Sequence, residues 1–110
     1  MKLKNVIIYK NFFNLLGGLR FSKKKQPLLL VLNKETRFNA VIDTFFVFYS
    51  TDILWLDKNM KIVDFRKNVK PFTFKIPKKK AKYIIEFSSR LNNVKIGEKV
   101  IIEDFAQAAS

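Results

Sequence analysis

The chain has 110 residues, 48% of them hydrophobic, with 22 Lys and Arg against 9 Asp and Glu, for a formal net charge of +13. A chain this apolar can bury a core and is not intrinsically disordered, and its length fits one domain. It contains no Cys and no His, which excludes disulfides, thiol nucleophiles, Ser-His-Asp relays and ordinary zinc sites.

Short apolar runs in the first half of the chain predict β-strands. Residues 3–9 form the first run, and residues 28–32, directly after the breaker Pro27, form the second. Residues 45–49 and 53–56 are apolar without alternation, which is typical of strands covered on both faces. We therefore expect residues 45–48 and 53–56 to be central strands.

A polar turn over residues 57–60 separates 53–56 from 62–65, which predicts a hairpin. Beyond Pro71, Phe72, Phe74 and Ile76 alternate with polar residues and predict another strand.

The last part of the chain continues this pattern. Residues 83–87 alternate and predict a further central strand, and the polar segment 77–81 before them predicts a loop. Residues 88–93 are expected to form a short helical turn. A turn over 94–98 then leads to a last strand, 99–102, and the tail 107–110 is expected to be frayed.

About seven short strands with at most one or two short helical turns predict a mainly β domain, residues 1–110. Because closing a small sheet removes its vulnerable edges, we expect a small closed or half-closed β-barrel. The N-terminal apolar run is too short for a signal peptide, and no segment approaches the length that spans a bilayer. The sequence therefore predicts a cytoplasmic protein without a transmembrane segment; its oligomeric state is left open.

Four segments resemble motifs of one known family. Residues 39–57 (NAVIDTFFVFYSTDILWLD) resemble the central motif of the domain-of-unknown-function family 192, in its archaeal form. Residues 77–86 and 94–100 follow in the family's order, and residues 18–21 (GLRF) are similar to its Gly-Leu-Met-Phe signature. The resemblance covers residues 15–100 and implies a compact, mainly β domain without established activity.

The chain also departs from the pattern of that family. Arg20 stands where the family has Met, and Ser22 where it has Arg. Apolar residues around 44–47 replace the family's Trp-Met-Lys-Asn-Thr stretch, so no ligand role of that stretch is carried over.

The basic clusters are the main candidate for a binding site. The excess of 18 Lys over 4 Glu is too large for thermophilic ion-pair networks, although an AT-rich genome would also raise Lys. Lysines on predicted loops can reach a phosphate backbone, and arginines offer planar forks for bidentate contacts. The predicted RNA- or phosphate-binding residues are Arg20, Lys23, Lys24, Lys25, Arg37, Arg66, Lys78, Lys79, Lys80 and Lys82.

These residues predict a non-enzymatic module that docks on structured RNA or on a ribonucleoprotein assembly such as a ribosome. The chain has no RNP-type aromatic motif, and Phe72 and Phe74 are better explained as core than as a base-stacking pair. We therefore expect phosphate contacts rather than base reading. No cofactor or metal is implied.

Three alternatives remain. A pocket in a barrel mouth, with Asp52, Trp55 and Glu86 as candidate lining residues, could take a small anionic or carbohydrate ligand. Asp52 and Glu86 could also be brought together by strand pairing, and two close carboxyl groups can split their pKa values for acid–base catalysis. Docking on an anionic membrane is a weaker alternative because no amphipathic helix is evident.

Overall fold

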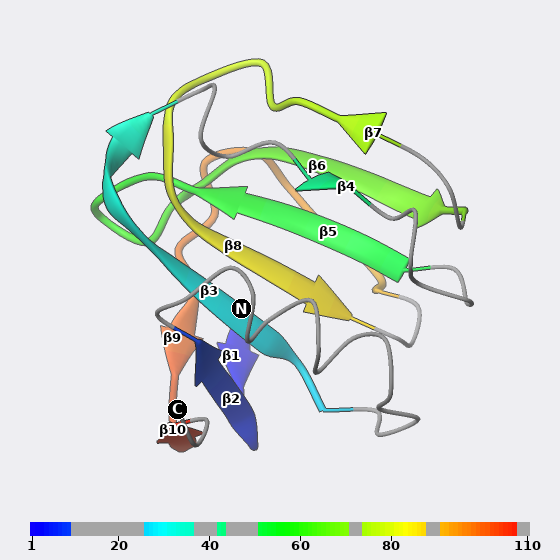
Figure 1. Cartoon of the computed structure of the whole chain (residues 1–110). Helices are drawn as coiled ribbons and strands as arrows, with labels where there is room; N and C mark the ends of the chain where they lie inside the picture. The colour runs from blue at the N-terminus through cyan, green and yellow to red at the C-terminus, as the bar shows by residue number, and fades with distance from the viewer. Residues whose placement is uncertain (10–25, 37–41, 44–50, 71–73, 88–90, 108–110) are drawn as a thin grey trace.

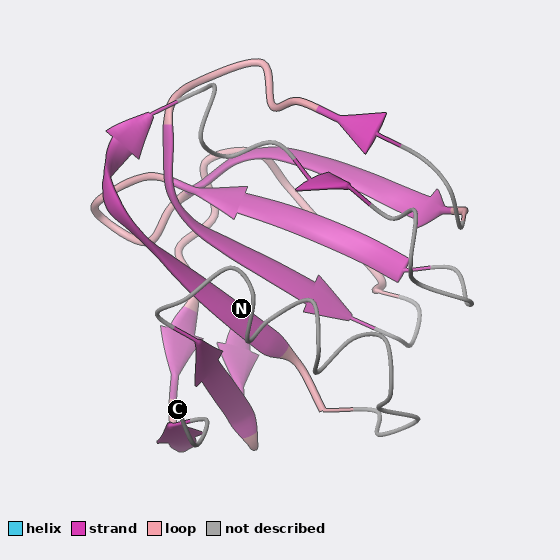
Figure 2. Cartoon of the chain, viewed as in Figure 1, coloured by secondary structure: helices cyan, strands magenta, loops and turns pink. Residues whose placement is uncertain are grey.

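The computed structural model describes residues 1–9, 26–36, 42–43, 51–70, 74–87 and 91–107, and these residues form strands and loops without a helix (Figure 2). The strands in this part of the chain are β1 (Lys2–Leu3), β2 (Val6–Tyr9), β3 (Leu28–Thr36), β4 (Ile42–Asp43), β5 (Thr51–Leu56), β6 (Ile62–Val69), β7 (Phe74–Lys75), β8 (Ala81–Phe87), β9 (Ile101–Ile102) and β10 (Phe105–Gln107). The predicted mainly β class is confirmed.

Six strands form the main sheet, in the order β10-β2-β3-β8-β5-β6 (Figure 1). Strand β8 runs antiparallel to both β3 and β5, and β5 runs antiparallel to β6. Strand β2 runs parallel to β3 and to β10. Two smaller pairs, β1–β9 and β4–β7, complete the described strands.

Both faces of the main sheet are buried at its centre. Because successive side chains of a strand point to opposite faces, β5 supplies Ile53 and Trp55 to one face and Leu54 and Leu56 to the other. The Trp55 face also holds Leu28, Leu30, Val69, Ala81 and Ile84. The Leu54 face also holds Val6, Leu29, Ile62, Ile85, Phe87 and Val100. All six residues of β5 are buried, which confirms the prediction of a strand covered on both sides.

The predicted hairpin is also confirmed, with β5 and β6 as its strands. In the turn, Asp57 Oδ1 accepts hydrogen bonds from the backbone N–H of Asn59 at 2.8 Å and of Lys61 at 3.0 Å. Met60 adopts a left-handed φ of 64°. An Asp side chain that satisfies local N–H groups explains why this polar tetrapeptide turns the chain.

The described strands do not close the main sheet into the expected barrel. Strands β10 and β6 are the two edges of the main sheet, and no described strand pairs with both of them. The reason lies in the C-terminal segment, which returns to the N-terminal strands through the pairs β1–β9 and β10–β2 instead of closing onto β6.

Several predicted boundaries are also corrected. The run 3–9 is divided into β1 and β2 at Asn5. Asn5 has a left-handed φ of 56°, a conformation that Asn tolerates better than most residues. Strand β3 continues four residues beyond the predicted end at Leu32. Residues 91–93 are not helical, the last predicted strand shortens to β9, and Gln107 lies in β10 rather than in a frayed tail.

The predicted strand around Phe72–Ile76 is reduced to Phe74–Lys75 within the described residues. The predicted strand 45–49 and Phe72 lie outside the described residues.

Candidate functional site

The loop between β7 and β8 carries three consecutive exposed lysines, Lys78, Lys79 and Lys80. Its backbone is anchored where the N–H of Lys78 donates to Asp64 Oδ2 at 2.8 Å. Asp64 lies on β6, is 4% exposed and also accepts hydrogen bonds at Oδ1 from the N–H of Phe65 and from Arg66 Nη1. Because a buried carboxylate with three donors holds its partners firmly, the loop presents its ammonium groups from a defined backbone.

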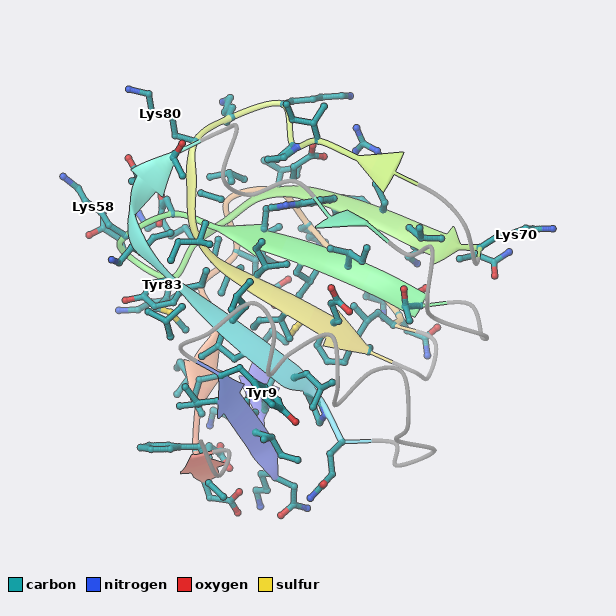
Figure 3. The ribbon with its side chains drawn as sticks, in the orientation of Figure 1. Tyr9, Lys58, Lys70, Lys80 and Tyr83 are labelled. Atoms are coloured by element: carbon teal, nitrogen blue, oxygen red, sulfur yellow. The ribbon has the colours of Figure 1, made fainter. Side chains whose placement is uncertain are left out.

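Lys58 lies at the same end of the main sheet, in the β5–β6 turn. Its N–H donates to Glu35 Oε2 at 3.0 Å, and the next residue, Thr36, pairs with Ala81 directly after Lys80. Figure 3 shows Lys58 and Lys80 on one side of the molecule and Lys70 on the opposite side. We refer to Lys58 with Lys78, Lys79 and Lys80 as the basic end.

Acidic side chains near the basic end are engaged by the backbone. Glu35 accepts from the N–H of Lys58, and Asp57 accepts from two N–H groups of its own turn. The ion pairs within the described residues involve the Met1 amino group, Lys2, Lys4 and Arg66 as cations, and no lysine of the basic end. The four ammonium groups are therefore not neutralised by the described part of the chain.

The other predicted cations are placed differently. Lys82 lies in β8 and not in a loop, because the strand already begins at Ala81, and its Nζ donates to the carbonyl of Leu32. The guanidinium of Arg66 pairs with Asp64 at 2.6 Å and donates to the carbonyl of Phe65 at 2.8 Å. The remaining predicted cations, Arg20, Lys23, Lys24, Lys25 and Arg37, lie outside the described residues.

The candidate pocket residues do not share one face of the sheet. Glu86 pairs with Ile53 and so points to the Trp55 face, whereas Asp52 pairs with Phe87 and points to the Leu54 face. Strand pairing therefore brings the backbones of Asp52 and Glu86 together but separates their carboxyl groups by the thickness of the sheet. A shared acid–base pair is not formed.

Glu86 is buried near the middle of the main sheet. It is 2% exposed, lies between Leu28 and Ile53 on the neighbouring strands, and neither carboxyl oxygen has a hydrogen-bond partner in the described structure. Desolvation raises the pKa of the Glu86 carboxyl to about 8. The group is therefore protonated at neutral pH. Thr51, on the same face, also has a buried hydroxyl without a partner there.

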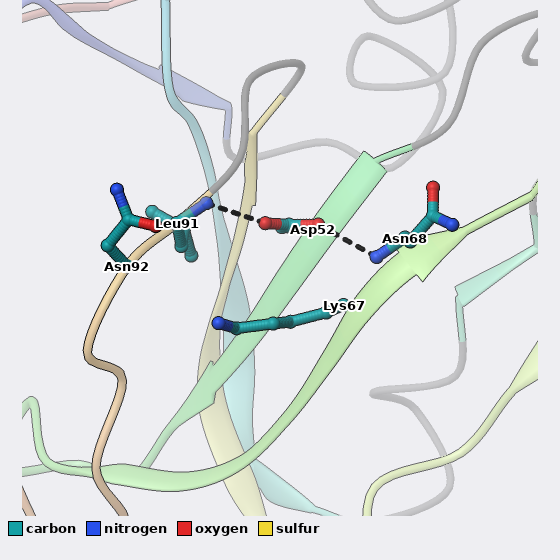
Figure 4. A pocket seen from close by; sticks show the side chains of 5 residues that line it. All are labelled: Asp52, Lys67, Asn68, Leu91 and Asn92. Atoms are coloured by element: carbon teal, nitrogen blue, oxygen red, sulfur yellow. Dashed lines mark hydrogen bonds between the residues drawn. The ribbon is translucent and has the colours of Figure 1, made fainter.

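Asp52 lines a cavity of about 260 Å³ at the end of the sheet opposite the basic end (Figure 4). The other lining residues are Lys67, Asn68, Leu91 and Asn92. Within the described ranges, no three metal-ligating side chains come together here or elsewhere.

Sequence reasoning missed Lys58 and most of this cavity. Lys58 is twenty residues from the Lys78 triplet, and only strand order shows that the two turns lie at the same end of the sheet. Asn68 could have been singled out from the sequence, because Asn is a residue type that tolerates the left-handed φ of 54° found at this position of an extended run.

The fold and its surface define a small, basic, mainly β domain with an open mixed sheet. The profile of DUF192, described as "Uncharacterized ACR", matches residues 5–102, and the chain belongs to this family. The resemblance to that family seen in the sequence is therefore confirmed.

Similar proteins come from archaea of the genera Pyrococcus and Thermococcus. The UPF0127 protein PH1112 of Pyrococcus horikoshii is 42% identical over 81 residues, which cover 74% of this chain and 70% of the relative. The UPF0127 protein PYRAB11210 of Pyrococcus abyssi is 37% identical over 98 residues, which cover 86% and 83%. These relatives are uncharacterised and assign no activity.

Two solved structures share the fold. A protein of unknown function from Novosphingobium aromaticivorans aligns with a TM-score of 0.64 at 13% identity, over 74% of this chain and 60% of that protein. A protein from Sinorhizobium meliloti aligns with the same TM-score at 11% identity, over 78% of this chain and 67% of the other. The described residues contain no helix able to cross a membrane.

Proposed function

We propose that the protein is a non-enzymatic binding module that docks on structured RNA, free or within a ribonucleoprotein, through phosphate contacts. The observation that supports this most is the basic end, where Lys58, Lys78, Lys79 and Lys80 lie at one end of the sheet without an ion-pair partner in the described structure. Four like charges on neighbouring turns repel one another unless an anionic partner offsets them.

The chemistry of the basic end fits phosphate better than base edges. Lysine is a flexible, strongly hydrated point charge with three donors, so it neutralises a phosphate without demanding one geometry. The described Arg66, which could make bidentate contacts, is already paired with Asp64. Phosphate contacts position a protein on nucleic acid but carry little sequence information, so binding by the basic end is promiscuous.

The proposal is tested by the salt dependence of RNA binding. The probe is a fluorescently labelled stem-loop RNA, titrated by anisotropy at several NaCl concentrations. If each lysine neutralises one phosphate, replacing Lys78, Lys79 and Lys80 together by Gln makes the slope of log K against log salt shallower by about 0.9 per lost contact. The loss of affinity is similar for stem-loops of different sequence.

A charge-matched control variant distinguishes binding at the basic end from general electrostatic attraction of RNA to the positively charged protein. Replacing Lys2, Lys4 and Lys95 by Gln removes the same charge from exposed positions outside the basic end, and we expect it to leave the slope nearly unchanged. Equal losses in the two variants, or wild-type binding that is undiminished at about 0.5 M salt, contradict the proposal.

A further inference from the structure

The cavity at Asp52 lies between three separate segments of the chain. Asp52 comes from β5, Lys67 and Asn68 from the end of β6, and Leu91 and Asn92 from the segment after β8 (Figure 4). Its volume of about 260 Å³ lies below the roughly 300–1,000 Å³ of pockets for drug-sized ligands, so any ligand has few heavy atoms.

Asp52 connects two of the chain segments that line this cavity. Its Oδ1 accepts the backbone N–H of Asn68 at 2.8 Å, and its Oδ2 accepts the backbone N–H of Leu91 at 2.7 Å. These two bonds tie the end of β6 to the 91–92 segment. Because each carboxylate oxygen can accept two hydrogen bonds, each keeps one acceptor position.

The charged groups of the cavity are held apart. Lys67 lines the same cavity as Asp52, yet no ion pair within the described residues joins them. Figure 4 shows the Lys67 ammonium toward the 91–92 segment and away from the Asp52 carboxylate. The cavity thus offers one cation, Lys67, and one anion, Asp52.

We propose that this cavity binds a small zwitterion of the free α-amino acid class. The ligand carboxylate contacts Lys67, and the ligand ammonium contacts Asp52. A plain anion of this size would meet the Asp52 carboxylate without compensation, and a plain cation would meet Lys67. Only a ligand that carries both charges satisfies both groups.

The test uses the whole protein labelled with ¹⁵N and follows the amide signals of Asn68 and Leu91, which report on Asp52. The probes are glycine, L-alanine and L-serine, compared at matched ionic strength with acetate and methylammonium, the two halves of glycine. We expect saturable shifts of both signals with at least one amino acid and none with either half. Lys67→Met should weaken this binding by about tenfold or more, because a charge-assisted hydrogen bond is lost.

Lys61→Met is the matched control, since Lys61 is an exposed lysine just before β6 and should leave the affinity unchanged. Three results overturn the inference: no saturable shift with any of the amino acids, acetate saturating as well as they do, or equal effects of the two substitutions. The site lies away from the basic end, so RNA binding and amino-acid binding succeed or fail independently.

Discussion

Glu86 illustrates how far a single buried side chain can lower the stability of the folded state. Its carboxyl group lies among Leu28, Ile53 and Ile84, without a partner in the described structure. Leaving a buried polar group unpaired costs about 1–3 kcal/mol, and an unpaired charge costs more. Asp64 on the same face shows the contrast, because three donors stabilise its carboxylate.

Glu86 should make stability fall as the pH rises. Burial raises the pKa of the Glu86 carboxyl from 4.5 to about 8 in the folded state. Between these values the folded protein binds a proton that the unfolded chain has lost, so ionisation favours unfolding. We expect Glu86 to lower the free energy of unfolding by up to about 1.4 kcal/mol per pH unit in this window.

Urea unfolding of the wild type and of Glu86→Gln at pH 5, 7 and 9 measures this effect. The amide is nearly isosteric and does not ionise, so the variant should lack this part of the slope. Its advantage over the wild type should grow with pH and level off above about pH 8. Parallel stability curves for the two proteins would refute the assignment.

Among the elements, β5 and β8 carry the centre of the fold. Leu54 is fully buried and pairs with Ile85 of β8 and Phe65 of β6. Leu54→Ala should therefore lower the free energy of unfolding by about 2–5 kcal/mol, because it leaves a cavity in a sheet packed on both faces. Ile101→Ala, at a position that is 46% exposed, should change it by no more than about 0.5 kcal/mol. Thermal or urea denaturation checks both values, and a comparable loss from both would contradict this placement of the core.

A strand or turn could be predicted where its own residues carry the signal for it, and not where it depends on distant parts of the chain. An unbroken apolar run predicted β5, local turn residues including Asp57 predicted the hairpin to β6, and alternation predicted β8, because each of these signals lies in neighbouring residues. The order of strands carries no such signal, and so the return of β9 and β10 to the N-terminal strands could not be predicted. The separation of Asp52 from Glu86 depends on register alone, which a one-residue shift would reverse.

For the molecule as a whole, the net charge of +13 affects the stability of the folded state. Self-repulsion weakens the compact state, and an anion that binds the folded form stabilises it by mass action. On the proposed function, inorganic polyphosphate at about ten times its Kd should add about 1.4 kcal/mol and raise Tm by roughly 5 °C.

Scanning calorimetry with polyphosphate, and with NaCl at equal ionic strength, measures this gain. The variant with Gln at positions 78–80 should gain much less than the wild type, whereas the variant with Gln at positions 2, 4 and 95 should retain most of the gain. Equal gains in all three proteins would indicate general screening of charge rather than binding at the basic end.

The parallel pairing of β2 with both β3 and β10 also bears on how the chain folds. Val6 is synthesised well before Phe105, with which it pairs. Contacts between such distant positions form slowly, because a long loop must close before they add stability. The antiparallel set β3, β8, β5 and β6 joins closer segments and should assemble first. During synthesis, β2 therefore keeps one edge unpaired until β10 has been made, and another chain could pair with that edge in the meantime.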